Sequence, residues 1–107
     1  MTDVCVVITT CGSEDTALTI ASALVDQSLA ACVSLLPGVK SYYFFEGSTH
    51  MDEEVKLIIK TRRELFNKVS GLITELHPYD VPEIMMLSVD GASEPFLNWL
   101  YQTTSPQ

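Results

Sequence analysis

The order of apolar and polar positions along the first third of the chain predicts a strand, a helix and a second strand. Residues 4–9, VCVVIT, form a short β-branched run that suits a strand buried on both faces. Ser13 can then cap a helix that has small and apolar residues on one face: Ala17, Ile20, Ala21, Leu24 and Ser28. The apolar segment at residues 30–36 is expected to end at Pro37 and Gly38.

A long hairpin is predicted next. Residues 39–47, VKSYYFFEG, form its first arm, and residues 48–61 form its second arm. In the second arm, Val55, Leu57 and Ile59 occupy every other position, which is the period of a strand. With a turn near residues 47–50, the aromatic residues of the first arm would project beyond the compact part of the domain.

The rest of the chain predicts a helix, a strand and a final helix. Thr61 and Glu64 have the spacing of a capping box. The apolar stripe of the helix then comprises Leu65, Val69, Leu72, Ile73 and Leu76. This helix should end near His77, because Pro78 disfavours the helical conformation in the residue before it. EIMMLSV is typical of a strand that begins at Glu83, and Ser93 with Pro95 predicts the start of the final helix.

The resulting order is that of an α+β, ferredoxin-like βαββαβ sandwich with an extended β-hairpin and a C-terminal helix. At 107 residues the chain is expected to form one domain, residues 1–107. Two helices would cover one face of a four-stranded antiparallel sheet, and nothing in the chain would cover the other face. That bare face and the projecting aromatic hairpin predict self-association.

Composition narrows the possible partners and the location of the protein. The net charge is −8, from 14 acidic and 6 basic residues, and only residues 60–63 concentrate positive charge. Nucleic acid is therefore not expected as a partner, because phosphate binding relies on clustered Lys and Arg. No apolar run approaches the roughly 20 residues that cross a bilayer, and a signal peptide is not evident. The protein is expected to be cytoplasmic, without a membrane partner.

The stretch HPYDVPEIMML, residues 77–87, contains the first two candidate functional residues. His77 is a possible metal ligand or general base, or simply a residue favoured at a helix C-terminus. Glu83 could pair with His77 or with a metal ion, or could be a solvated residue at the start of a strand. Pro78 and Pro82 redirect the chain between helix and strand, which is a structural role.

The three cysteines cannot all pair with one another, and without a secretory signal they are expected to be free thiols. Cys11 follows the first strand at a turn near a helix N-terminus, where the pKa of a thiol can be lowered. It is a candidate metal ligand or redox-sensitive group, with an ordinary exposed cysteine as the alternative. An enzyme with Cys11 as nucleophile or His77 as base is a further alternative, but no orienting or oxyanion signature accompanies these residues.

Four collinear blocks carry a resemblance to a known family: LAACVSLLPGVKSYYFFEG, EVKLIIKT, HPYDVPEI and a late Trp99. From Asp3 to about Thr103 the chain resembles the CutA divalent-cation tolerance family. The resemblance implies a ferredoxin-like homotrimer, related in architecture to PII signalling proteins, whose long hairpins extend the sheets of neighbouring subunits. It also implies copper binding by a cysteine after the first strand, the histidine of the His-Pro-Tyr motif and the glutamate that follows.

Carried over to this chain, that histidine and glutamate are His77 and Glu83. In the implied trimer their loop borders a cleft between subunits, where Tyr79 is also available to a ligand. The family cysteine falls on Thr9, and Cys11 lies two residues later. Phe45 stands where many relatives have tryptophan, which keeps an aromatic ring but removes an indole hydrogen-bond donor.

The sequence therefore predicts a non-enzymatic, homotrimeric protein that binds copper(II) or a small molecule in clefts between subunits. His77, Glu83 and Cys11 are the candidate metal ligands, and no cofactor is required. Copper(II) suits imidazole and carboxylate ligands and forms the tightest complexes among the common divalent ions. The alternative is a PII-like metabolite sensor or assembly scaffold without a physiological metal.

Overall fold

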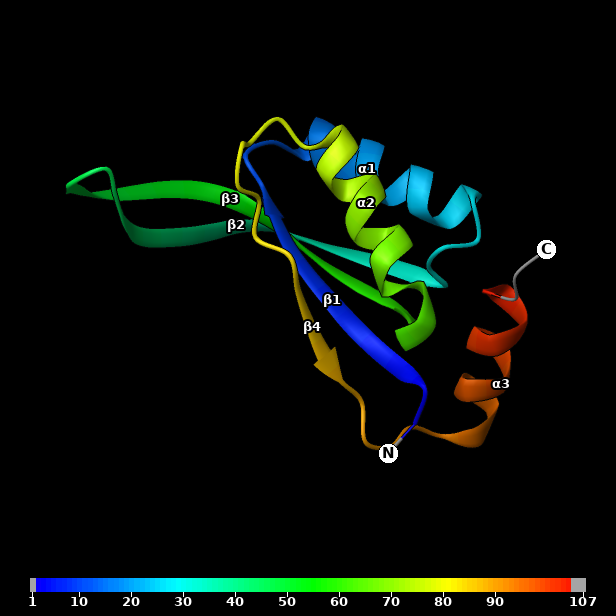
Figure 1. The fold of residues 1–107 in the computed structure, drawn as a ribbon. Coiled ribbons are helices and arrows are strands. Elements are labelled where there is room, and N and C mark those ends of the chain that lie inside the picture. The colour runs from blue at the N-terminus through cyan, green and yellow to red at the C-terminus, as the bar shows by residue number, and fades with distance from the viewer. Residues whose placement is uncertain (1, 105–107) are drawn as a thin grey trace.

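The computed structural model describes residues 2–104, so residue 1 and residues 105–107 of the expected domain lie outside the described residues. The chain forms a mixed α+β fold with a long projecting hairpin (Figure 1). The elements in chain order are β1 (Val4–Cys11), α1 (Glu14–Asp26), β2 (Cys32–Phe45), β3 (Ser48–Arg62), the 3₁₀ turn η1 (Arg63–Leu65), α2 (Phe66–Leu76), β4 (Met85–Ser88) and α3 (Glu94–Thr103). The predicted βαββαβ order with a C-terminal helix is confirmed.

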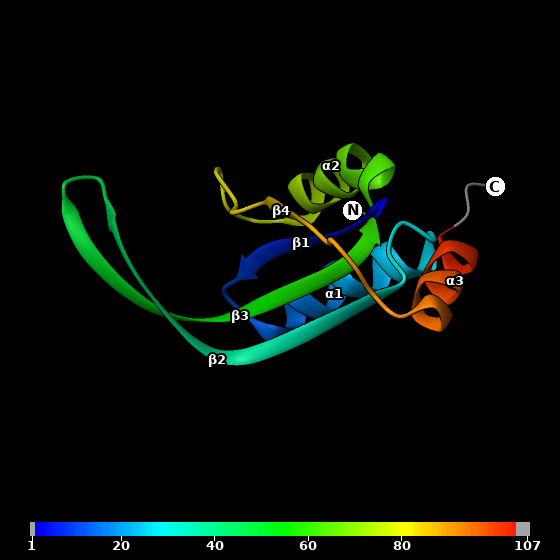
Figure 2. The same ribbon diagram turned by 90° about the horizontal axis from the view of Figure 1, so that it is seen from below.

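The four strands form one antiparallel sheet in the order β2-β3-β1-β4. β1 lies in the interior of the sheet, where Val4 pairs with Arg62 of β3 and Cys11 pairs with Val55. Helices α1 and α2 lie side by side over one face of the sheet (Figures 1 and 2). Because side chains alternate along a strand, every second residue of β1 and β3 points toward these helices.

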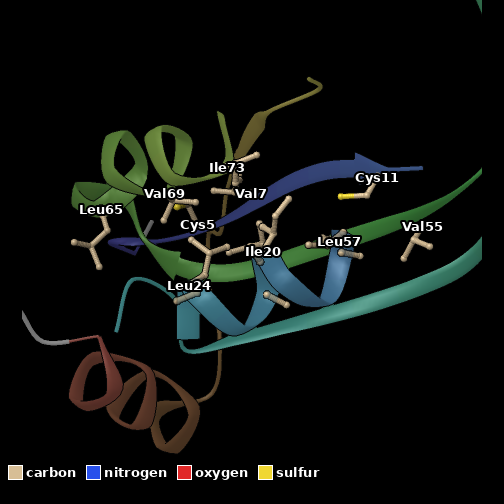
Figure 3. Packing of buried hydrophobic residues seen from close by; sticks show 14 residues of the cluster. Cys5, Val7, Cys11, Ile20, Leu24, Val55, Leu57, Leu65, Val69 and Ile73 are labelled. Carbon is tan, nitrogen blue, oxygen red and sulfur yellow. The ribbon is translucent and has the colours of Figure 1, made fainter. Parts of the chain in front are cut away.

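The main hydrophobic core fills the space between the sheet and the two helices (Figure 3). The predicted apolar faces are confirmed at Ile20 and Leu24 of α1 and at Val69 and Ile73 of α2, which are completely buried. The ends of both predictions are wrong, because Ser28 lies beyond the end of α1 and Leu65 lies in the 3₁₀ turn before α2. Ser13 caps α1 as expected by accepting a hydrogen bond from the Thr16 N–H. The predicted alternation in β3 is confirmed by its buried residues Val55, Leu57 and Ile59.

Within residues 2–104, helix α3 covers one end of the opposite face of the sheet. There Val4 packs against Leu100 of α3 in a second, smaller cluster, which also contains Ala31. Farther along β1, Val6 and Ile8 are only partly buried, so the prediction that residues 4–9 are buried on both faces is wrong at these two positions. We refer to this face as the open sheet face.

The β2–β3 hairpin extends well beyond the sheet, and the described chain measures 45 × 25 × 22 Å as a result (Figure 2). Pro37 and Gly38 do not end β2, contrary to the prediction, because pairing with β3 resumes after an irregularity between Leu36 and Val39. Gly47, with φ of +82°, forms the turn near the expected position. Aromatic side chains on the arm are exposed, reaching 77% for Tyr42.

Two further element boundaries differ from the prediction. Thr61 does not cap a helix: it belongs to β3, and its hydroxyl donates to the Leu29 carbonyl across 2.6 Å. α2 instead begins at Phe66, after the 3₁₀ turn. β4 begins at Met85, so Glu83 lies in the loop before the strand and does not open it. Among residues 2–104, no helix has both the length and the apolar character needed to span a bilayer.

The core position of Ile73 gives a first test of this fold. Ile73→Ala should lower the free energy of unfolding by about 2–5 kcal/mol, since it removes a completely buried side chain and leaves a cavity. Urea denaturation measures the change. Glu75→Ala on the exposed side of α2 is the control, with an expected change within about 0.5 kcal/mol. Equal effects of the two substitutions would contradict the placement of α2.

Candidate functional site

Side chains from β1, β3 and the loop between α2 and β4 meet where the hairpin leaves the sheet. We call this group the hairpin-base cluster; its members are Thr10, Glu54, Lys56, His77, Tyr79 and Glu83. β1 ends here, and β3 enters the sheet here from the projecting arm. Pro78 and Pro82 lie in the connecting loop, which returns the chain from α2 to β4.

His77 holds this loop against β1. It is the C-cap residue of α2, as the sequence predicts, and its side chain is only 7% exposed. Its Nε2 lies 2.8 Å from the Thr10 carbonyl oxygen, and its Nδ1 accepts a hydrogen bond from the Tyr79 N–H across 3.2 Å. Because a carbonyl can only accept, this network places the ring proton on Nε2. Both ring nitrogens of His77 are therefore engaged within the chain.

Tyr79 connects the loop to β3. Its ring packs against His77 with 4.6 Å between ring centroids, and its hydroxyl donates to Glu54 Oε2 across 3.0 Å. Glu54 is only 8% exposed, so this bond pairs a buried carboxylate. Burial, together with the hydrogen bond and charge of Glu54, raises the pKa of Tyr79 to about 12. A Cβ at Gly12 would lie 3.0 Å from the Tyr79 hydroxyl oxygen, so a glycine there leaves room for the ring.

Glu83 lies on the other side of Thr10. The Thr10 hydroxyl donates to Glu83 Oε2 across 2.6 Å, and Lys56 Nζ lies 3.7 Å from the same oxygen. Thr10 thus links the two predicted residues, through its carbonyl to His77 and through its hydroxyl to Glu83. The Glu83 side chain is 39% exposed, which leaves the carboxylate accessible from outside.

Cys11 does not lie at an exposed turn. It is the last residue of β1, completely buried in the main core (Figure 3). Burial, with a smaller contribution from the charge of Glu54, raises the pKa of its thiol to about 11. The expectation of a lowered pKa is therefore wrong, because β1 continues to Cys11 and alternation turns this side chain toward the helices. A buried, protonated thiol is a poor metal ligand and a poor nucleophile.

Thr9, at the position matched to the family cysteine, is also completely buried. Within residues 2–104, its Oγ1 is the one buried side-chain oxygen or nitrogen atom without a hydrogen-bond partner. A buried hydroxyl without a partner costs free energy. Thr9 therefore differs from Thr61, another buried threonine of the sheet, whose hydroxyl is bonded to the Leu29 carbonyl.

The predicted ligands are only partly brought together. His77 and Glu83 lie at the same end of the sheet and share Thr10 as a partner, whereas Cys11 faces the core. Within the described part of one chain, no three side chains of His, Cys, Asp or Glu gather in a group that could hold a metal ion. A complete metal site at this position would require ligands from a second copy.

Sequence reasoning missed three members of the hairpin-base cluster. Thr10 and Lys56 lie opposite each other in the β1–β3 register, and Glu54 lies two positions before Lys56. The period of two in β3 could have shown that Glu54 and Lys56 lie on the face of the sheet opposite to Val55. Only the register between strands shows that Thr10 meets Glu83.

Comparison with known proteins assigns the family. The CutA1 divalent ion tolerance protein family matches residues 5–103. The chain belongs to the CutA family. It is 42% identical over 99 residues to the divalent-cation tolerance protein CutA of Thermus thermophilus, an alignment that covers 92% of this chain and 96% of that protein. It is 39% identical over 95 residues to mouse protein CutA, covering 89% of this chain and 54% of the mouse protein.

Solved structures of CutA proteins share this fold. The divalent cation tolerance protein of Thermus thermophilus superposes with a TM-score of 0.92 at 41% identity, covering 95% of this chain and 99% of that one. CutA of Xylella fastidiosa gives a TM-score of 0.95 at 33% identity, covering 97% and 100%. The CutA relatives differ in the locations their names state, since the Archaeoglobus fulgidus protein is called periplasmic and the Arabidopsis thaliana protein chloroplastic.

The unpartnered hydroxyl of Thr9 gives a stability test. Thr9→Val should raise the free energy of unfolding by about 1 kcal/mol, because it replaces that hydroxyl with a methyl group of similar size. Thr61→Val is the matched control and should lower it by about 1–2 kcal/mol, since it leaves the Leu29 carbonyl without its donor. Urea denaturation of both variants measures the difference. A loss of stability in Thr9→Val would show that the hydroxyl has a partner in solution.

The Glu54–Tyr79 hydrogen bond gives a spectroscopic test. Glu54→Gln should lower the pKa of Tyr79 from about 12 toward its ordinary value of 10, without reaching it, because burial is the larger cause of the shift. Ultraviolet titration of tyrosinate measures this pKa, and Tyr79→Phe identifies the step. Glu46→Gln at the hairpin tip is the control and should leave the step in place. An unchanged pKa in Glu54→Gln would contradict the contact.

The same raised pKa predicts the sign of a pH effect. The protonated phenol is favoured in the folded state, so its contribution to stability is complete below pH 10 and is lost as the pH rises from 10 through about 12. In Tyr79→Phe this part of the alkaline loss of stability should be absent.

Proposed function

We propose that this CutA-family protein assembles as a homotrimer and binds copper(II), or another divalent cation, in clefts between subunits beside His77 and Glu83. The observation that carries the proposal is the linkage of these two side chains through Thr10 at the base of the hairpin. The role is one of binding and requires no catalytic step or resident cofactor. It accords with the divalent-cation tolerance family to which the chain belongs.

Self-association is supported by apolar surface that residues 2–104 of one chain leave exposed. Tyr42 and Phe44 on the hairpin arm are 77% and 74% exposed. On the open sheet face, Met85 and Leu87 of β4 are about half exposed, at 48% and 51%. Exposed apolar surface on an extended arm and on a sheet face is typical of an interface between subunits. The arm is long enough to lie against a neighbour rather than its own domain.

Metal binding is supported by the donor atoms and by their hydrogen bonds. The Nε2–H of His77 is held by the Thr10 carbonyl, which leaves Nδ1 as the nitrogen with a lone pair. A backbone carbonyl that fixes one ring nitrogen while the other binds metal is a common arrangement for histidine ligands. The Tyr79 N–H now occupies that lone pair and would have to move aside. Glu83 supplies an accessible carboxylate oxygen.

Cys11 has no part in the proposed site, because its thiol lies in the core with a raised pKa. The remaining ligands come from a neighbouring subunit. Copper(II) suits this imidazole and carboxylate set and ranks highest in affinity among the common divalent ions. Because copper(II) binds many protein surfaces tightly, copper binding supports a specific site only if it is stoichiometric and persists in the presence of competing zinc.

Native mass spectrometry of metal-free protein, with copper(II) added against competing zinc, tests the proposal. A trimer that gains a defined number of copper ions is expected. By calorimetry, His77→Ala and Glu83→Gln should weaken copper binding by about 10–100-fold while the trimer persists. Cys11→Ala is the control and should leave copper affinity unchanged. A monomer in native mass spectrometry would contradict the proposed trimer. Unchanged copper affinity in His77→Ala would contradict the proposed metal site.

A PII-like sensor of a small metabolite, or an assembly scaffold without a physiological metal, is the second candidate. It is favoured by the engagement of both His77 ring nitrogens and by the absence of a three-ligand group within residues 2–104 of one chain. A trimer with scattered or no copper binding in the same experiment would support this candidate. Saturable binding of one compound in a metabolite screen would then identify its ligand.

A further inference from the structure

A cysteine and a lysine lie in contact on adjacent strands, away from the hairpin-base cluster. Cys32 of β2 and Lys60 of β3 are directly opposite in the sheet register. Lys60 Nζ lies 3.6 Å from Cys32 Sγ and donates a hydrogen bond to Ser34 Oγ across 2.9 Å. Ile59 points into the core, so its neighbour Lys60 points to the open sheet face. The strand pairing therefore fixes a thiol beside a primary amine.

This thiol differs from the other two in the chain. Cys5 and Cys11 are completely buried, and burial raises the pKa of both thiols. Cys32, by contrast, is only partly buried within a single chain. Oxidation of cysteine follows exposure as well as thiolate character. Of the three sulfurs, Cys32 is thus the one placed for oxidation.

The amine is also well placed to react. Ser34, two residues after Cys32 on the same strand, holds Nζ near the sulfur through its hydroxyl. Within residues 2–104, no carboxylate forms an ion pair with Lys60, whereas the next lysine on that face, Lys56, is paired with Glu83. No acidic side chain of the described part therefore competes with Cys32 for the Lys60 nitrogen.

We propose that Cys32 and Lys60 form a reversible oxidative crosslink, an S–N bond between β2 and β3. A peroxide first oxidises the thiol: RSH + H2O2 gives RSOH + H2O, with two electrons passing from sulfur to the peroxide. The Lys60 ammonium releases a proton to water, and the resulting amine attacks the sulfenic sulfur. The S–O bond breaks, and the departing hydroxide takes a second proton from nitrogen: RSOH + R′NH3+ gives RS–NHR′ + H2O + H+. Sulfenic acids condense with backbone nitrogen in the same way.

The crosslink would change the open sheet face in two ways. It replaces the Lys60 ammonium with a neutral group, and it joins residues 32 and 60 covalently. Closing that loop restricts the unfolded chain and should raise the melting temperature of the oxidised protein. A thiol reductant cleaves the S–N bond and restores both side chains. None of these steps involves the proposed metal site.

Mass spectrometry of the full chain, treated with hydrogen peroxide in the presence of a metal chelator, tests the crosslink. The intact mass should fall by two hydrogens and return to its starting value after reduction. Lys40 is the first basic residue, so all three cysteines lie in the tryptic peptide 1–40. Trypsin does not cleave at a modified lysine, so the expected product is peptide 1–40 joined to residues 57–62. Further cleavage after Glu14 separates Cys32 from Cys5 and Cys11.

Variants identify the residues that supply the sulfur and the nitrogen of the proposed bond. Cys32→Ser and Lys60→Arg should each abolish the linked peptide and the rise in melting temperature. The first variant removes the thiol, and the second keeps the positive charge but lacks a primary amine. Lys56→Arg, on the same strand and face, is the matched control and should retain the link. A Cys32 peptide that gains oxygen without a link overturns the proposal. A linked peptide that retains the peroxide oxygen, or a link that survives in Lys60→Arg, also overturns the S–N bond.

Discussion

The antiparallel pairing of β1 with β3 determines where the functional side chains of this protein lie. It places Cys11 opposite Val55, so the thiol points to the helices, and Thr10 opposite Lys56, so the threonine points to the open sheet face. A shift of one residue would exchange these directions, because side chains alternate strictly along a strand. The buried residues of β1 and β3 oppose such a shift, since it would expose Val7 and Leu57 to water.

His77 has a structural role and a proposed binding role that use the same hydrogen bonds. Its ring fastens the end of α2 and the following loop to the Thr10 carbonyl. That bond also fixes the ring tautomer and orients the other nitrogen, which an isolated histidine on a flexible loop would not achieve. Structural and binding roles are therefore not exclusive here, and the position of one side chain serves both.

Local patterns predicted the elements well because their causes are local. The apolar stripe of α2 and the Ser13 cap of α1 depend on residues three or four positions apart. The continuation of β2 through Pro37 and Gly38 was missed, because β3 lies alongside and supplies partners on both sides of the irregularity. Thr61 was misplaced for a similar reason, as its hydroxyl bonds to the Leu29 carbonyl rather than to a helix end.

The candidate site was predictable only as far as His77 and Glu83. Their proximity follows from a short loop that contains two prolines, but their common partner Thr10 is more than sixty residues away in sequence. The direction of Cys11 depends on how far β1 continues, and its pairing with Val55 decides that. The pattern of neighbouring residues carries no information about such contacts between segments that are distant in sequence.

The pairing of β4 with β1 has a consequence for how the chain comes together. The β2–β3 hairpin joins strands that follow each other in sequence, so their pairing closes only a short loop of chain. The pairing of Cys5 with Ser88 closes a loop of most of the protein, and the entropy lost on closure grows with the length enclosed. The hairpin-base cluster lies at the other end of the same β1–β4 pairing, where Thr10 contacts Glu83. Its geometry is therefore a property of the complete fold and is not inherited from any shorter folded piece.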